Sequence, residues 1–194
     1  MRRLCVFCGS STGSAAVYAE QARRLGQAIA ARGLGLVFGG GHIGLMGVLA
    51  DAVLQAGAEA IGVIPQALVD KELAHDRLTE LHVVSTMHQR KALMADLADG
   101  FAALPGGFGT ADELFEILTW AQLGLHAKPI GLLNTAGYFD PLLAWLDRAV
   151  AEGFVKRQHR GLLLEADEPE RLLDLLSSYR AGEATAKWIE RADR

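Results

Sequence analysis

Short, almost wholly apolar runs alternate with longer amphipathic runs along most of this 194-residue chain. Apolar strands separated by helices indicate a parallel sheet that helices cover on both faces. With right-handed crossovers, the pattern predicts an α/β fold with a doubly wound parallel sheet. The expected strands are Leu4–Cys8, Gly35–Phe38, Ala60–Ile64, Leu81–Val84, Gly100–Leu104, Ile130–Leu133 and Leu162–Leu164. The expected helices are Ala16–Arg32, Leu45–Ala56, Thr86–Ala98, Ala111–Leu123, Pro141–Glu152 and Pro169–Tyr179.

Composition narrows the class of protein further. With 51% hydrophobic and 22% charged residues the chain is globular, and its net charge of -4 without a Lys/Arg cluster does not favour nucleic-acid binding. No apolar run approaches the roughly 20 residues that cross a bilayer, and the run after Arg3 is too short for a secretory signal. We therefore expect a cytoplasmic protein without membrane contact. Residues 1–180 are expected to form a single nucleotide-binding domain, and residues 181–194 a polar C-terminal tail.

The segment Pro105–Glu113 (PGGFGTADE) lies between a strand-like run and a helix-like run. A turn of this kind gathers main-chain N–H groups at the positive end of the helix dipole, which is a ready site for a phosphate. Gly106, Gly107 and Gly109 let the backbone approach an anion without intervening side chains. Glu113 follows, where the next atoms of a phosphorylated substrate could reach it. The segment therefore predicts phosphate binding beside a carboxylate that can act as an acid or a base.

Two other interpretations of the same segment are a P-loop and a capping box. It lacks the Gly-Lys-Ser/Thr ending of a P-loop, so it does not indicate triphosphate and magnesium binding. Thr110 and Glu113 have the spacing of a capping box, which would serve only to begin a helix. A capping box does not require three nearby glycines, which cost chain entropy, so we favour the functional interpretation.

A second turn, Gly39–Gly44 (GGGHIG), fits the pattern G-x-G-x-x-G and raises the question of a dinucleotide cofactor. Glu59 has the spacing of the acidic residue that holds the ribose, but it precedes its strand. The ligand should lie at the other end of that strand, where Val63, Ile64 and Pro65 offer no carboxylate. The pattern therefore disfavours a nicotinamide or flavin cofactor and remains compatible with a nucleoside monophosphate.

Arg90 interrupts an apolar stripe that Met87, Met94 and Leu97 form on one predicted helix. A guanidinium in such a stripe is costly unless it is paired or faces a ligand. In the expected fold, Arg90 lies near the same end of the sheet as Glu113. A ligand-facing arginine and a plain structural ion pair both remain open.

Cys5 and Cys8 have the C-x-x-C spacing of some redox and zinc sites. They fall in one expected strand, where residues three apart point to opposite faces, and the chain has no other cysteine. We expect two buried thiols and no metal site.

Several stretches together resemble the LONELY GUY (LOG) family of phosphoribohydrolases, which are often mislabelled as lysine decarboxylases. The resemblance extends over roughly residues 3 to 180 and is carried by Met87–Lys91, Pro105–Glu113, Cys8–Ser11, Gly39–Gly41, Gly44–Gly47 and Leu118–Trp120. It implies a Rossmann-like fold, a homodimer, and hydrolysis of the N-glycosidic bond of N6-modified adenosine 5′-monophosphates. The products would be a free cytokinin base, or adenine, and ribose 5-phosphate. No lysine sits in a recognisable pyridoxal phosphate setting, so lysine decarboxylation is not indicated.

By this resemblance, Arg90 and Glu113 match the catalytic pair. The implied substrate contacts are Glu72, Arg90, Lys91, Gly107, Phe108, Gly109, Thr110, Ala111, Asp112, Glu113 and Thr119. Glu113 would stabilise positive charge at C1′ and take a proton from water, and Arg90 would keep Glu113 ionised. No cofactor is expected. A nucleotide-sensing protein without activity and a dinucleotide-dependent oxidoreductase are the alternatives.

Overall fold

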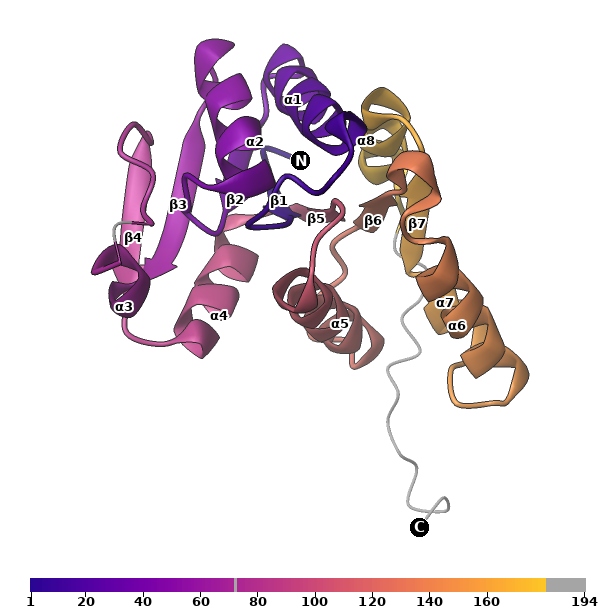
Figure 1. Ribbon diagram of the computed structural model, residues 1–194. Coiled ribbons are helices and arrows are strands. Elements are labelled where there is room, and N and C mark those ends of the chain that lie inside the picture. The colour runs from indigo at the N-terminus through magenta and orange to yellow at the C-terminus, as the bar shows by residue number, and fades with distance from the viewer. Residues whose placement is uncertain (72, 181–194) are drawn as a thin grey trace.

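The computed structural model describes residues 1–71 and 73–180, so the expected tail and Glu72 lie outside the described residues. Seven parallel strands form one sheet in the order β4-β3-β2-β1-β5-β6-β7 (Figure 1). The strands are β1 (Arg3–Phe7), β2 (Gly35–Phe38), β3 (Ala60–Pro65), β4 (Glu80–Val84), β5 (Gly100–Ala103), β6 (Ile130–Leu133) and β7 (Leu163–Ala166). The helices are α1 (Ala16–Ala31), α2 (Gly44–Gln55), α3 (Gln66–Val69), α4 (Met87–Leu97), α5 (Phe108–Gln122), α6 (Asp140–Ala151), α7 (Arg157–Arg160) and α8 (Pro169–Ser178), with a 3-10 turn, η1, at Thr135–Gly137.

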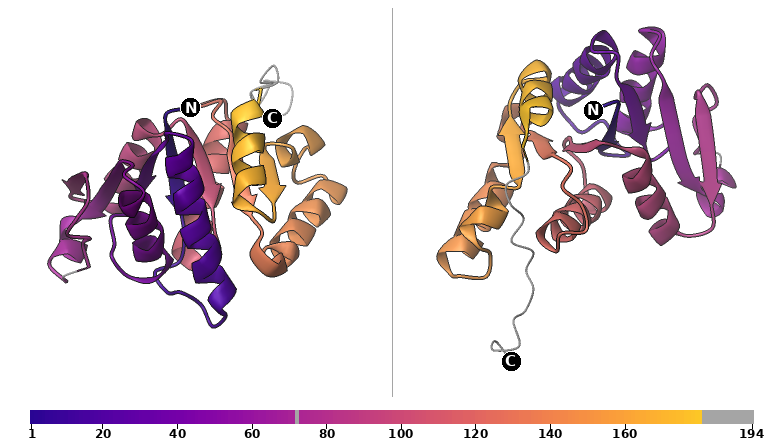
Figure 2. Two further views of the ribbon diagram at one scale, coloured as in Figure 1. Left: turned by 90° about the horizontal axis from the view of Figure 1, so that it is seen from above. Right: turned by 180° about the vertical axis from the view of Figure 1, so that it is seen from behind.

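Helices cover both faces of this sheet. In Figure 1, α1, α2 and α8 lie above the sheet, and α4, α5 and α6 lie below it. The further views show α1 and α8 side by side (Figure 2), and Arg32, the C-cap of α1, pairs with Asp174 of α8 at 2.7 Å. The predicted doubly wound α/β fold is therefore confirmed, and it is Rossmann-like.

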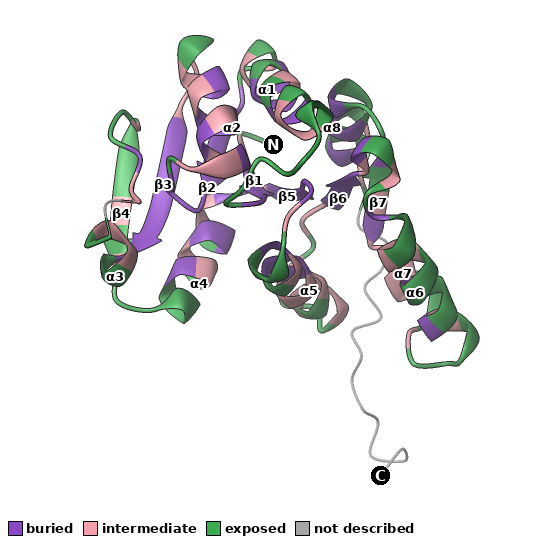
Figure 3. Cartoon of the chain, viewed as in Figure 1, coloured by how far each residue is buried: buried purple, intermediate pink, exposed green. Residues whose placement is uncertain are grey.

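Successive side chains along a strand alternate between two apolar layers, one on each face of the sheet. Leu4 and Val6 of β1 pack with the α1, α2 and α8 layer, whereas Cys5 and Phe7 pack with the α4, α5 and α6 layer. Cys8 returns to the first layer, and both thiols are free and buried, as the alternation predicts. Figure 3 shows the central strands buried and the edge strand β4 largely exposed.

The strand order reverses its direction at β1. From β1 the chain builds outward through β2, β3 and β4, and α4 then returns it to β5 on the other side of β1. Loops that leave the carboxyl ends of β1 and β5 therefore diverge, and ligands of open α/β sheets bind in the crevice between such loops. Both the loop between β1 and α1, which contains Gly9, and the Pro105–Glu113 segment lie at this point.

The boundaries differ from the sequence prediction by a few residues, with one consequence for the site. The helix expected from Ala111 begins three residues earlier, at Phe108. α3 and α7 were not predicted, because four residues are too few to show a helical repeat. Within residues 1–71 and 73–180, no helix has both the length and the apolar character to cross a bilayer.

Candidate active site

A cavity of about 340 Å³ opens at the carboxyl ends of β1, β2 and β3, beside the start of α5. Its walls combine main chain from glycine-rich turns, one buried ion pair and a group of aliphatic side chains. They are formed by Val6, Phe7, Cys8, Gly9, Ser10, Gly39, Gly41, Ile43, Met46, Ile64, Leu68, Leu73, Arg90, Gly107, Phe108, Gly109, Thr110 and Glu113.

The first turn of α5 forms one side of the cavity. Gly107 is the N-cap, and Ala111 is the residue whose N–H donates to the Gly107 carbonyl, at 3.1 Å. The N–H groups of the three residues between them have no acceptor within the helix, so the positive end of the helix dipole faces the cavity. A side chain at Gly107 or Gly109 would meet open space, so glycine leaves these N–H groups accessible. This end of α5 can hold an anion such as a phosphate.

The capping-box alternative is wrong. Thr110 lies inside the first turn of α5 and is buried, and the N-cap Gly107 has no side chain to accept a bond. Gly106 is explained by close packing, because a Cβ there would lie 2.1 Å from the Thr110 hydroxyl oxygen. Gly106 therefore lets the start of α5 pack closely against Gly9, in the loop after β1. Gly107 and Gly109 leave the main-chain N–H groups at the start of α5 accessible.

Arg90 and Glu113 meet at the floor of the cavity. Arg90 extends from α4, and its Nη1 lies 3.3 Å from Oε1 of Glu113, with both side chains buried. The guanidinium also donates from Nε to the Val63 carbonyl at 3.0 Å and from Nη2 to the Gly39 carbonyl at 3.2 Å. The ends of β3 and β2 thus fix the guanidinium, which in turn fixes the carboxylate. The structure shows an ion pair that also faces a cavity, so the two sequence alternatives for Arg90 are not exclusive.

The Gly39–Gly44 turn has packing reasons for its glycines. A Cβ on Gly39 would lie 1.8 Å from Nη2 of Arg90, so this position must be glycine for the guanidinium to fit. Gly44 has a φ of +62°, and a Cβ there would lie 2.3 Å from the carbonyl carbon of Ser10. Packing against Arg90 and against Ser10, in the loop after β1, therefore accounts for these glycines of the G-x-G-x-x-G pattern, and no dinucleotide is needed to explain them.

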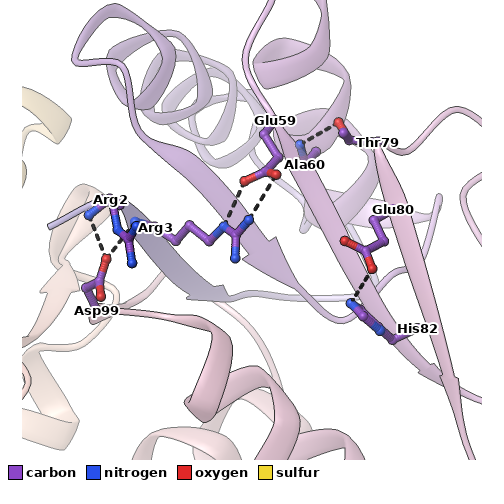
Figure 4. Close-up of polar contacts among 8 residues, drawn as sticks. All are labelled: Arg2, Arg3, Glu59, Ala60, Thr79, Glu80, His82 and Asp99. Atoms are coloured by element: carbon purple, nitrogen blue, oxygen red, sulfur yellow. Dashed lines mark hydrogen bonds and ion pairs between the residues drawn. The ribbon is translucent and has the colours of Figure 1, made fainter.

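Glu59 lies at the opposite edge of the sheet. Its carboxylate pairs with Arg3 at 2.8 Å, next to Asp99, which accepts from the N–H groups of Arg2 and Arg3 (Figure 4). A larger cavity of about 590 Å³ lies at this amino edge, but Arg3, Glu59 and Asp99 line it, and Arg90 and Glu113 are absent from its walls. We assign the chemistry to the smaller cavity, because ligands of such sheets bind at the carboxyl edge.

Burial raises the pKa of Glu113 to about 7. Desolvation of the carboxylate is the largest cause, the positive charge of Arg90 opposes it, and the negative charge of Asp112 adds to the rise. The sequence predicted that Arg90 would keep Glu113 ionised. Arg90 does favour the ionised form, but burial outweighs it, so Glu113 exchanges its proton near neutral pH.

The structure brings six of the residues expected at the site into the cavity wall: Arg90, Gly107, Phe108, Gly109, Thr110 and Glu113. Among the described residues, Lys91, Ala111, Asp112 and Thr119 do not line this cavity. Lys91 pairs with Asp112 at 2.9 Å and with Glu116 at 3.1 Å, and the Thr119 hydroxyl donates to the Phe115 carbonyl. Glu72 lies outside the described residues.

Sequence reasoning missed the apolar wall of the cavity. It consists of Ile43, Met46, Ile64, Leu68 and Leu73. The last two belong to the connection between β3 and β4. A four-residue helix and a loop give no periodic signal, so only the folded chain shows that these side chains face the cavity. Across residues 1–71 and 73–180, no group of three or more His, Cys, Asp or Glu residues is arranged to hold a metal ion.

Comparison with known proteins decides the family. A family model described as "Possible lysine decarboxylase" matches residues 46–176. The chain is 50% identical over 177 residues to a probable cytokinin riboside 5′-monophosphate phosphoribohydrolase of Oryza sativa subsp. japonica, covering 91% of this chain and 79% of the relative. It is 48% identical over 178 residues to a cytokinin riboside 5′-monophosphate phosphoribohydrolase of Arabidopsis thaliana, covering 92% and 84%. The chain belongs to the LOG family.

Solved structures agree with this LOG-family chain in fold. The molybdenum cofactor binding protein of Rippkaea orientalis superposes with a TM-score of 0.70 at 22% identity, covering 92% of this chain and 97% of the other. The molybdenum cofactor carrier protein of Chlamydomonas reinhardtii gives 0.68 at 22% identity, covering 92% and 99%. At this identity the likeness shows the fold alone. The decarboxylase description fits the cavity poorly, because its walls, among the described residues, contain no lysine.

Proposed function

We propose that this chain hydrolyses the N-glycosidic bond of adenosine 5′-monophosphate or its N6-modified forms. The products are the free base, a cytokinin or adenine, and ribose 5-phosphate. One observation carries the proposal: a buried carboxylate, paired with an arginine, lies one helical turn from an open helix N-terminus. The names of relatives at about half identity support the same reaction.

The phosphate binds first in this mechanism. Its oxygens accept from the free N–H groups of Phe108, Gly109 and Thr110, where the helix dipole favours negative charge. Glu113 lies four residues beyond Gly109, about 6 Å along the helix axis. That separation lets the ribose extend from the bound phosphate and bring C1′ to the carboxylate. The glycine-rich end of α5 therefore positions the bond that breaks.

Glu113 acts on the positive charge that develops at C1′. Cleavage of a glycosidic bond passes through an oxocarbenium-like state, which a buried carboxylate stabilises. The same carboxylate accepts a proton from the attacking water, a role that suits a pKa of about 7. Arg90 holds the carboxylate in place through its contacts with the Val63 and Gly39 carbonyls. The leaving base takes up a proton from solvent, which balances the proton that Glu113 removes from the attacking water.

The base extends toward the aliphatic side of the cavity. Met46 and Leu73 belong to this wall, and the first turn of α5 lines the same cavity. A purine and an aliphatic N6 substituent both gain from leaving water for such a surface. The wall therefore supports N6-modified substrates.

Incubation with adenosine monophosphate and with its N6-isopentenyl analogue, followed by chromatography, tests the reaction. We expect release of free base and ribose 5-phosphate from at least one nucleotide. Glu113→Gln should abolish release while the circular dichroism spectrum stays that of the wild type. Glu152→Gln, a carboxylate change at the end of α6, is the matched control and should retain activity. Binding without turnover would instead support a sensor, and uptake of a nicotinamide cofactor an oxidoreductase.

We also propose that the chain forms a homodimer. Large apolar side chains are exposed on α5, α6 and the turns that follow them, including Leu125 at 69%, Trp145 at 57% and Phe154 at 83%. A group of exposed apolar residues is typical of a surface that binds another protein. Light scattering during size exclusion should give twice the mass of one chain, and Trp145→Glu should reduce it. A wild type that elutes as a monomer at micromolar concentration would contradict the dimer. The cytoplasmic location and the domain division at residue 180 stay predictions.

A further inference from the structure

The connection between β3 and β4 closes one side of the candidate active site. Its described parts are residues 66–71 and 73–79, which we call the covering segment. Leu68 and Leu73 of this segment line the cavity. A short antiparallel contact joins it to the β2–α2 turn, where the His42 N–H donates to the Leu73 carbonyl at 3.0 Å. The His75 N–H donates to the Gly40 carbonyl at 2.8 Å in the same contact.

The side chain of His75 makes a second, separate attachment. Its ring is 3% exposed, and Nε2 lies 3.3 Å from Oδ1 of Asp51 on α2. Nδ1 accepts from the Arg77 N–H at 3.2 Å. An Nδ1 that accepts must carry no proton, so the ring proton is on Nε2 and is donated to Asp51. The neutral ring thus makes two directed bonds inside the protein.

Asp51 connects this attachment to α2. Its Oδ1 accepts hydrogen bonds from both the His75 ring and the Arg77 guanidinium, the latter at 2.5 Å. Asp51 lies on α2, the helix whose first turn contributes Met46 to the aliphatic wall. The contact therefore ties the segment that carries Leu73 to the helix that carries Met46, and both residues belong to the aliphatic wall.

We propose that His75 is a positioning residue for substrate binding. Through Asp51 it holds the covering segment so that Leu68 and Leu73 form the wall that receives the base end of the nucleotide. The proposal rests on the proposed function, and it concerns affinity for the base and its N6 substituent. His75 and Asp51 are not among the residues that line the cavity, so neither touches the reacting atoms.

The catalytic pair is held by other contacts. Arg90 is fixed by carbonyls at the ends of β2 and β3, and Glu113 by α5 and Arg90. Loosening the covering segment leaves these bonds in place. An interaction that contributes equally to ground state and transition state changes KM and leaves kcat. The expected signature of His75 is therefore a change in KM alone.

The test compares His75→Ala with His75→Gln and His82→Ala in steady-state assays. For N6-isopentenyl adenosine monophosphate, His75→Ala should raise KM about tenfold, the factor that one lost hydrogen bond to a charged group represents, with kcat changed less than about twofold. The rise should be smaller for plain adenosine monophosphate, which lacks the apolar substituent. His75→Gln keeps an N–H donor for Asp51 and should restore most of the affinity. His82, which pairs with Glu80 on β4, is the matched control and should leave KM unchanged (Figure 4).

A second variant approaches the contact from its other side. Asp51→Ala removes the acceptor from a half-exposed helix position, where alanine favours the helix, and it should raise KM in the same way. An unchanged KM in both His75→Ala and Asp51→Ala overturns the proposal. An equal fall of kcat with both substrates also overturns it, because that result would indicate damage to the catalytic pair.

Hydrogen exchange in the free protein tests the attachment without any turnover. The His42 amide, which donates to the Leu73 carbonyl, should exchange about tenfold faster in His75→Ala than in the wild type. Unchanged exchange at His42 overturns the proposed attachment. If the wild type hydrolyses neither nucleotide, the proposed function fails, and the exchange result still decides whether His75 holds the covering segment.

Discussion

Glu113→Gln should remove a large part of the pH dependence of folding stability. Burial raises the pKa of Glu113 from 4.5 to about 7 in the native protein. Between these values the native state keeps a proton that the unfolded state has released. Wild-type stability therefore falls as pH rises through this window and becomes level above about 7. Glutamine does not titrate, so the variant should lack this fall.

The magnitude follows from the size of the shift. Each pKa unit corresponds to about 1.36 kcal/mol, and the window between pH 5 and pH 8 contains most of the shift of Glu113. The stability of Glu113→Gln relative to the wild type should therefore increase by about 2–3 kcal/mol from pH 5 to pH 8. The Glu113 side chain is only 9% exposed, so solvent screens little of this effect. In the variant, Arg90 loses its carboxylate partner, which changes the stability by about the same amount at every pH. The difference between pH 5 and pH 8 therefore stays the same.

Urea unfolding followed by tryptophan fluorescence at pH 5, 6.5 and 8 measures the effect. Glu152→Gln removes a surface carboxylate and serves as the control for net charge. A change of similar size in that control would assign the effect to charge in general. Parallel stability curves for Glu113→Gln and the wild type would refute the argument, because they would show that the carboxylate is not desolvated on folding.

Further outcomes follow from the same geometry. The value of kcat/KM should rise with pH and level off above about 7, as Glu113 loses its proton and becomes a base; a profile without an inflection near 7 would exclude this role. Gly39→Ala should displace the Arg90 guanidinium, because its Cβ would lie 1.8 Å from Nη2, and should lower kcat about 100-fold; retained kcat would contradict the packing argument. Arg90→Met should abolish hydrolysis and raise the pKa of Glu113 further, since the opposing positive charge is gone, which NMR titration of the carboxyl group would detect. A pKa left near 7 in that variant would show that Arg90 does not act on the carboxylate.

Much of the fold was predictable because its signals are local. Short apolar runs such as Gly35–Phe38 and Ile130–Leu133 are strands in the structure, since both faces of a parallel sheet are covered. The spacing of Cys5 and Cys8 predicted opposite faces, and they pack in opposite layers. The start of α5 was misplaced because Phe108, Gly109 and Thr110 carry no strong helix signal, and only the packing of Gly106 against Thr110 fixes the turn.

The candidate site was predictable in its turns and unpredictable in its contacts. Glycines and a carboxylate in one short segment indicate a phosphate site, because main-chain N–H groups at a helix end attract anions whatever the rest of the fold. The partner of the carboxylate is different. Arg90 meets Glu113 only because α4 and α5 lie on the same face of the sheet, and the carbonyl of Gly39, 51 residues away, fixes its direction.

The order of strands and helices along the chain, the glycine-rich turns that follow the strands and the arginine in an apolar stripe can all be read from the amino-acid sequence. These follow from interactions among neighbours along the chain. The folded chain was needed to show that Glu113 is desolvated enough to hold a proton near neutral pH, and that Leu73 and Met46 come together in one wall of the cavity. Burial and cavity walls depend on which distant segments come together, and the hydrophobic effect that joins them is not directional.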